Sequence, residues 1–203
     1  IFDNLSEWTV QDSTGYWHVQ NTYINSTIID GITASGDYGS CILISSENDD
    51  CITPRIFGFT IRNGRGTYVQ RPYPTPEGEE DQYQRIGGAI LFDVSNPTIE
   101  YNQFLNNGSL NIHSGGSIYG TTIEEDWSFN NRENSRSRCE VEEFILNNNL
   151  YNGNEALYGN DFANKGFINA NEEFFEFNMS ESYFHVGNCE ANQISPVFIY
   201  IEN

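Results

Sequence analysis

Residues 54–64 read Pro-Arg-Ile-Phe-Gly-Phe-Thr-Ile-Arg-Asn-Gly, and the pattern returns at residues 97–108 as Pro-Thr-Ile-Glu-Tyr-Asn-Gln-Phe-Leu-Asn-Asn-Gly. Pro aligns with Pro, Ile with Ile, and Asn63 with Asn106, at an offset of 43 residues. An internal repeat of this kind points to a fold built from stacked copies of one unit. Each copy is a short alternating apolar run between Pro, Gly and Asn, which predicts strands separated by tight turns.

A second repeat sets the length of the unit. Gly87-Gly88-Ala89-Ile90-Leu91 returns 28 residues later as Gly115-Gly116-Ser117-Ile118-Tyr119. If residues 67–86 are an inserted loop of 20 residues, the offset of 43 falls to 23. Helical periodicity is scarce, with a weak candidate at 140–146. We therefore expect one all-β domain over 1–203, part of a longer protein, in which parallel strands form a solenoid of roughly 23–28-residue coils.

These motifs resemble those of a known family. Ser-Thr-Ile-Ile-Asp-Gly at 26–31, Gly-Phe-Thr-Ile-Arg-Asn-Gly at 58–64, and the Gly-Gly and Asn-Pro-Thr-Ile segments within 87–99 are similar to the right-handed parallel β-helix repeats of the pectin-lyase-like superfamily. The resemblance covers about 26–131 and implies a secreted or cell-surface protein of the bacterial type. It says little about activity, since catalytic and non-catalytic members share the fold.

Asparagine has an expected place in such a stack. Its side-chain amide bonds to the equivalent Asn of the next coil, and its backbone tolerates the left-handed conformation. We expect Asn63, Asn106, Asn131 and Asn149 to form a ladder at one turn. The alternative is that Asn is simply common in loops.

The charge excludes several classes of partner. Nine Lys and Arg stand against 29 Asp and Glu, for a net charge of −20. Nucleic acids and anionic lipid surfaces require clustered cations, so neither is expected as a partner. No apolar run approaches the roughly 18 residues of a membrane helix, so no membrane insertion is expected. The aromatic content of 14% is ample for a folded core.

The four cysteines, Cys41, Cys51, Cys139 and Cys189, lack the C-x-x-C spacing of a zinc site. Three disulfide connectivities exist for four cysteines. We expect Cys41 with Cys51, which closes a short loop, and Cys139 with Cys189. The alternative is four buried thiols in a reducing compartment.

The insertion at 67–86 gathers the candidate binding residues. Four of the nine cations lie in it or just before it, together with three tyrosines. Guanidinium groups bind carboxylates or sulfates, and tyrosine rings stack on sugar faces at low entropic cost. The candidate glycan-binding residues are Arg62, Arg65, Tyr68, Arg71, Tyr73, Tyr83 and Arg85. The alternative is a solvated loop whose arginines pair with its own carboxylates.

No cofactor is expected, although calcium is a candidate because it requires oxygen ligands on adjacent loops. The acidic runs that qualify by composition are 49–50, 77–81 and 124–126. None of them has the spacing of an EF-hand loop. Acidic runs are more often solvated surface.

The expected function is a non-catalytic module that binds glycan or serves an adhesive or structural role. No recognisable catalytic constellation is present: His18, His113 and His185 are isolated from one another, and Lys165 is the single lysine. The alternative is a polysaccharide lyase or glycoside hydrolase acting on an acidic polysaccharide, with Arg62 and Arg65 as candidates. A plain structural spacer is a third hypothesis. The sequence leaves the ligand and the oligomeric state open.

Overall fold

The structure is a computed structural model that describes residues 7–14, 17–32, 39–45, 52–75, 78–93, 95–121, 143–165, 167–171 and 200–202. Strands dominate this part of the chain, and its single α-helix is the five-residue α1 (Thr22–Ser26). The predicted mostly-β class is therefore confirmed. No helix within these ranges has the length and apolar character needed to cross a membrane.

Most strands belong to three parallel sheets. The β5 sheet has the order β5 (Arg55–Phe57), β10 (Thr98–Glu100), β13 (Glu143–Asn147), β16 (Phe167–Asn171). The β6 sheet has the order β3 (Ile28–Asp30), β6 (Thr60–Arg62), β11 (Gln103–Leu105), β14 (Leu150–Asn152). The β9 sheet has the order β4 (Ile42–Ser45), β9 (Ile90–Asp93), β12 (Ile118–Thr121), β15 (Phe162–Lys165), β17 (Tyr200–Glu202).

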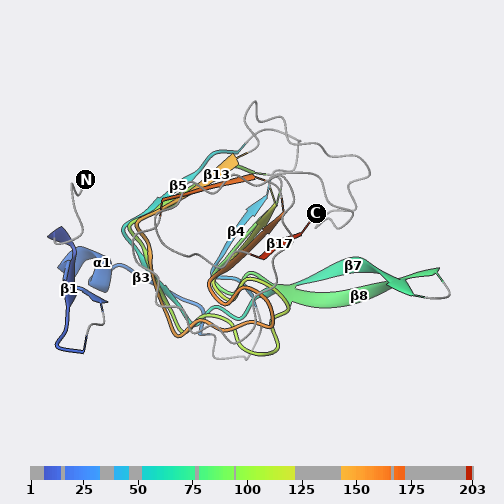
Figure 1. The fold of residues 1–203 in the computed structure, drawn as a ribbon, viewed down its shortest axis with the longest axis horizontal. Coiled ribbons are helices and arrows are strands. Elements are labelled where there is room, and N and C mark those ends of the chain that lie inside the picture. The colour runs from blue at the N-terminus through green and yellow to red at the C-terminus, as the bar shows by residue number, and fades with distance from the viewer. Residues whose placement is uncertain are drawn as a thin grey trace.

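Strands that follow one another along the chain enter successive sheets. We call each such set a rung: β3 and β4 are the first, β5, β6 and β9 the second, β10, β11 and β12 the third, β13, β14 and β15 the fourth, and β16 and β17 the fifth. In the orientation of Figure 1 the strands of one sheet largely overlie each other, and the three sheets surround a common interior. Within each sheet, the strand of one rung thus lies beside the strand of the rung before it.

The register follows the sequence repeat. Arg55 pairs with Thr98 and Ile56 with Ile99, at the predicted offset of 43. Other offsets are 28 from β9 to β12, 47 from β10 to β13, and 24 from β13 to β16. The offsets of 24 and 28 lie in the predicted range. The larger ones span either residues 67–86 or residues 122–142, which lie between strands of successive rungs.

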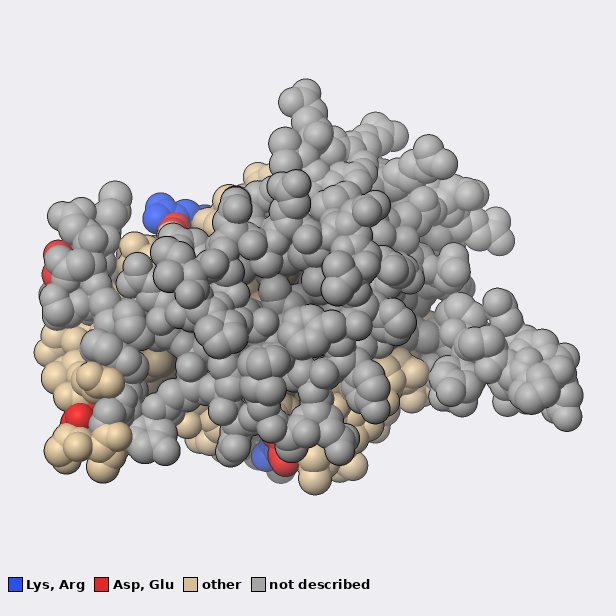
Figure 2. Space-filling view, in the orientation of Figure 1, with Lys and Arg blue, Asp and Glu red and all other residues tan. Residues whose placement is uncertain are grey.

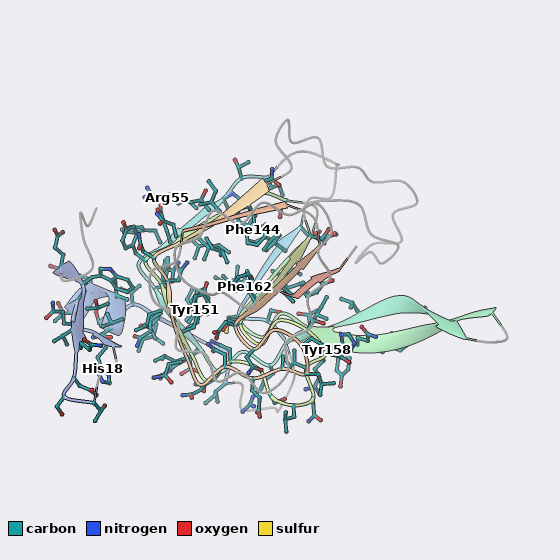
Figure 3. All side chains as sticks on the ribbon, viewed as in Figure 1. His18, Arg55, Phe144, Tyr151, Tyr158 and Phe162 are labelled. Carbon is teal, nitrogen blue, oxygen red and sulfur yellow. The ribbon has the colours of Figure 1, made fainter. Side chains whose placement is uncertain are left out.

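The core lies between the three sheets. Inward and outward residues alternate as the period of two requires: on β9, Ile90 and Phe92 belong to the core cluster, whereas Leu91 lies in a separate cluster. In Figure 3, Phe144, Tyr151 and Phe162 point into this interior from β13, β14 and β15. The Phe104 and Tyr151 rings of consecutive rungs are stacked, with centroids 5.2 Å apart. The cluster comprises Ile44, Ile56, Ile61, Ala89, Ile90, Phe92, Ile99, Phe104, Ile118, Phe144, Leu146, Tyr151 and Phe162.

Each short turn places one residue in the left-handed backbone region. Between the β5 and β6 sheets these residues are Gly58, Tyr101 and Asn148, with φ of 79°, 53° and 51°. After the β6 sheet they are Asn63, Asn106 and Gly153, with φ of 59°, 52° and 65°. Glycine and asparagine adopt this conformation most readily, which accounts for their recurrence at the strand ends.

The asparagine ladder exists, but mostly at other residues than expected. The Asn102 amide nitrogen donates to Asn149 Oδ1 at 3.1 Å, and the Asn107 amide nitrogen donates to Asn154 Oδ1 at 3.0 Å. These pairs form two ladders at two different turns. All four side chains are buried. Each ladder residue directly follows the left-handed residue of its turn.

Of the predicted ladder residues Asn63, Asn106, Asn131 and Asn149, the prediction was therefore wrong for Asn63 and Asn106 and right for Asn149. Asn63 and Asn106 are the left-handed residues themselves. Asn106 N donates to Asn152 O of the next rung at 2.9 Å. Asn131 itself lies outside the described residues.

A small N-terminal unit covers the outer side of the β6 sheet. It consists of the antiparallel strands β1 (Thr9–Gln11) and β2 (Trp17–Val19) and of α1. Trp8 and Ile24 pack with Leu150 of β14 in one buried cluster. Thr60 Oγ1 donates to Ile24 O at 2.8 Å, which ties the unit to β6. In Figure 1 it lies on the opposite side of the body from the β7–β8 hairpin.

Candidate functional site

Residues 67–86, expected as an inserted loop, form an antiparallel hairpin of β7 (Thr67–Thr75) and β8 (Gly78–Ile86). The hairpin projects from the body between the second-rung strands β6 and β9 (Figure 1). At its base, Ser40 Oγ lies 3.0 Å from Thr67 Oγ1 and donates to Gly87 O. Ser40 therefore holds both ends of the insertion together.

One face of the hairpin is anchored to the body. Val69 and Ile86 pack with Leu91, Tyr119 and Ala163 on the outer side of the β9 sheet. All five side chains are buried. This apolar contact fixes which face of the hairpin base turns outward, because successive strand residues alternate between faces.

The opposite face carries the two exposed tyrosines predicted from the sequence. Tyr68 pairs with Arg85, and Gln70 pairs with Tyr83. Tyr68 is 53% exposed and Tyr83 is 71% exposed. The Arg85 guanidinium lies 4.7 Å from the Tyr68 ring centroid, and its Nη2 donates to the Tyr68 hydroxyl at 2.8 Å. The Tyr83 hydroxyl donates to Gln70 Oε1 at 3.4 Å. These four residues present two rings and several hydrogen-bonding groups on one surface.

The remaining hairpin candidates are known by backbone register. Arg71 pairs with Gln82, and Tyr73 pairs with Glu80. The side chains of Arg71 and Tyr73 lie outside the described part of the structure.

Of the two arginines before the hairpin, Arg62 is held in an ion pair. Arg62 Nε lies 2.7 Å from Asp30 Oδ2, across the β6 sheet from β3. Hydrogen bonds from Asn63 and the Ile32 backbone, with the Arg62 contact, hold the pKa of Asp30 below its ordinary value. Arg65 is exposed, and its backbone nitrogen donates to Gly39 O at 2.9 Å. On the face in Figure 2, the blue atoms of described residues lie beside red atoms.

Two further rungs continue the surface beside the hairpin base, and sequence reasoning missed them. His113 N donates to Arg85 O at 2.7 Å, and Leu157 N donates to Ile112 O at 2.8 Å, so Arg85, His113 and Leu157 follow one another across three rungs. The His113 and Tyr158 rings meet edge to face, with centroids 5.0 Å apart. Figure 3 places Tyr158 near the point where the hairpin leaves the body. We call Tyr68, Arg85, His113, Leu157 and Tyr158 the loop strip.

A signal for the loop strip was present in the sequence. The pairs Gly87-Gly88 and Gly115-Gly116 lie in register with Gly159-Asn160, because Ile86, Ser114 and Tyr158 form successive parallel bridges. Residues that stand at the same distance before the repeated glycines are therefore neighbours on successive rungs, which applies to Arg85, His113 and Leu157. His113 was instead considered only as an isolated candidate base.

The cysteine and calcium predictions remain untested. The Sγ of Cys41 lies 3.5 Å from Arg62 O, and burial raises the pKa of the Cys41 thiol to about 11. Cys51, Cys139 and Cys189 lie outside the described residues, so both disulfides stay predictions. Within the described ranges no His, Cys, Asp and Glu side chains form a group able to hold a metal ion. The acidic runs 49–50 and 124–126 lie outside those ranges, as do Glu77 and the side chains of 78–81.

Comparisons with family models, with curated proteins and with solved structures found no match to this chain. The resemblance to the pectin-lyase-like superfamily therefore stays a prediction drawn from the motifs.

Proposed function

We propose that the chain is a right-handed parallel β-helix module of an exported or cell-surface protein, and that its β7–β8 hairpin binds carbohydrate without catalysing a reaction. The strand order supports the β-helix, since the second, third and fourth rungs each add one strand to each of the three parallel sheets. The motif resemblance described above supports the same fold and the same location.

The observation that carries the binding proposal is the pair of exposed tyrosines on one face of a projecting hairpin. Tyr83 at 71% exposure and Tyr68 at 53% leave two rings on the same hairpin face accessible to a ligand. Tyrosine rings are rigid, so contact with a sugar face costs little side-chain entropy. The nearby Gln70 and Arg85 groups are suited to hydrogen bonds with sugar hydroxyls.

The ion pair of Arg62 weighs against the lyase alternative. A lyase of acidic polysaccharides needs cations at the uronate carboxylate as well as a base beside it. Arg62, one of the two candidates for that role, is bound to Asp30 at 2.7 Å. Binding through the tyrosine face is therefore the better supported function.

Substituting Tyr83→Ala is expected to weaken carbohydrate binding about tenfold, the scale of one lost ring contact. The measurement is binding of the purified protein to a glycan array containing neutral, uronate and sulfated glycans. Tyr23→Ala is the matched control, because Tyr23 is 79% exposed but lies on α1, away from the hairpin. Equal array signals from wild type and the Tyr83 variant, or no signal from wild type, would remove the assignment.

A further inference from the structure

We propose that the binding surface runs from the hairpin onto the loop strip, and that its ligand is an uncharged, extended polysaccharide lying along the direction in which the rungs stack. This inference rests on the proposed function and adds the class of glycan and its orientation. Three observations carry it: the alignment of the strip with the stack, the chemistry of its side chains, and its charge.

The alignment follows from the backbone bonds. Arg85, His113 and Leu157 belong to consecutive rungs, which parallel strand pairing separates by about 4.8 Å. An extended pyranose chain advances by about one strand spacing per sugar. A glycan lying along the stack therefore presents successive sugars to successive rungs, and each added sugar meets a new side chain until the strip ends.

The side chains suit the faces and the rims of sugar rings. Tyr68 and Leu157 are 53% and 47% exposed and offer apolar surface for the C–H faces of pyranoses. His113 and Tyr158 are half-buried, and their edge-to-face contact holds both rings in place. Preorganised rings lose little side-chain freedom on binding, which lowers the entropic cost of contact with a sugar chain.

The charge around the strip selects against an acidic glycan. Arg85 is the single cation among the five strip residues, and its guanidinium already lies against the Tyr68 ring and hydroxyl. Exposed Glu155 is two residues before Leu157, and the whole chain carries a charge of −20. The strip therefore offers a polyuronate one cation beside the nearby Glu155 carboxylate, within a chain whose overall negative charge repels polyanions.

The test uses hexasaccharides and disaccharides of β-1,4-linked glucose, xylose and mannose, with galacturonate oligomers of the same lengths, titrated by calorimetry. We expect at least one neutral hexasaccharide to bind about tenfold or more tightly than its disaccharide and than the galacturonate hexamer. Tyr158→Ala and His113→Ala should each reduce hexasaccharide affinity about tenfold and leave disaccharide binding nearly unchanged. Tyr23→Ala again serves as the control, and melting curves verify that each variant is folded.

The outcomes separate this inference from the proposed function. Tighter binding of the galacturonate hexamer overturns the uncharged ligand. If the affinity does not depend on the length of the oligosaccharide, the loop strip is not part of the site. The same conclusion follows if Tyr158→Ala and His113→Ala leave binding unchanged while Tyr83→Ala weakens it, and the hairpin then remains the site. A wild-type protein that binds none of these oligomers and gives no array signal overturns both.

Discussion

Replacing Asn107 with Ala is expected to lower the free energy of unfolding by about 3–5 kcal/mol. The Asn107 side chain is fully buried and makes three hydrogen bonds of 3.0 Å. Its Oδ1 accepts from Gly64 N in the second rung, and its Nδ2 donates to Ile61 O and to Asn154 Oδ1. Alanine leaves the buried Gly64 N without its side-chain acceptor and removes one donor each from Ile61 O and Asn154 Oδ1, although Asn154 Oδ1 still accepts from the backbone nitrogen of residue 107. An unsatisfied buried group costs about 1–3 kcal/mol, and each further lost hydrogen bond about 0.5–1.5 kcal/mol.

The measurement is urea unfolding followed by tyrosine and tryptophan fluorescence. Asn111→Ala is the matched control in the loop that follows, because Asn111 is exposed and its side chain lies at the surface. A surface change of this kind is expected to stay within about 0.5 kcal/mol. If Asn107→Ala lost no more stability than Asn111→Ala, the ladder would contribute nothing to the fold.

The ladder also explains what sequence reasoning could and could not predict. The sequence-based prediction gave two roles to a single asparagine in each turn: a side-chain amide that forms the ladder hydrogen bond, and a backbone in the left-handed conformation. The structure divides them between adjacent residues: Asn106 has a φ of 52°, and Asn107 makes the ladder bonds. A run of two asparagines at 106–107 therefore serves two different physical roles. Residue composition alone cannot decide which of the two faces the interior.

The register between two rungs was predictable where the sequence reveals the insertion that lies between them. The offset of 43 placed Ile56 beside Ile99 correctly, because the Pro and Ile pattern is carried by strands that pair directly. The prediction failed beyond residue 121. There β10 pairs with β13 at an offset of 47, so residues 122–142 lie between strands of the third and fourth rungs. The predicted period of roughly 23–28 residues does not anticipate an offset of this length.

The candidate site was predictable only in part for a related reason. Tyr68, Tyr83 and Arg85 were identified from composition, because the insertion is rich in tyrosine and arginine. That Arg62 would pair with Asp30, 32 residues earlier in the chain, depended on knowing that β3 lies beside β6. The loop strip likewise depends on contacts between rungs, and these follow from the register rather than from local sequence.

Substituting Asp161→Asn is expected to raise stability above neutral pH and to remove a pH dependence of the wild type. Asp161 is buried beside the end of the same ladder, where Asn154 Nδ2 donates to its Oδ1 at 3.1 Å. Burial raises its pKa from 3.8 to about 7, against the opposing effect of this hydrogen bond. An asparagine in its place keeps an oxygen that can accept from Asn154 and carries no charge to desolvate.

The sign of the pH dependence follows from proton binding. Between about pH 4 and pH 7 the folded protein keeps a proton on Asp161 that the unfolded chain has released, so the free energy of unfolding falls as pH rises. The contribution of this group is level above about pH 7 and below about pH 4. Its slope is at most about 1.36 kcal/mol per pH unit, so the upper limit of the gain for Asp161→Asn at pH 8 is about 4 kcal/mol.

The measurement is urea unfolding of wild type and Asp161→Asn between about pH 3 and about pH 8, roughly one unit beyond each pKa, so that both plateaus are reached. The difference between the two proteins isolates Asp161 from the other carboxyl groups. Asp30→Asn is the control with the opposite sign. The pKa of Asp30 is lowered, so its stabilising contribution is present above the unfolded value and is lost as pH falls through the folded one. If the free energies of unfolding of wild type and Asp161→Asn changed in parallel with pH, the pKa of Asp161 would be the same in the folded and unfolded protein, and the prediction would be wrong.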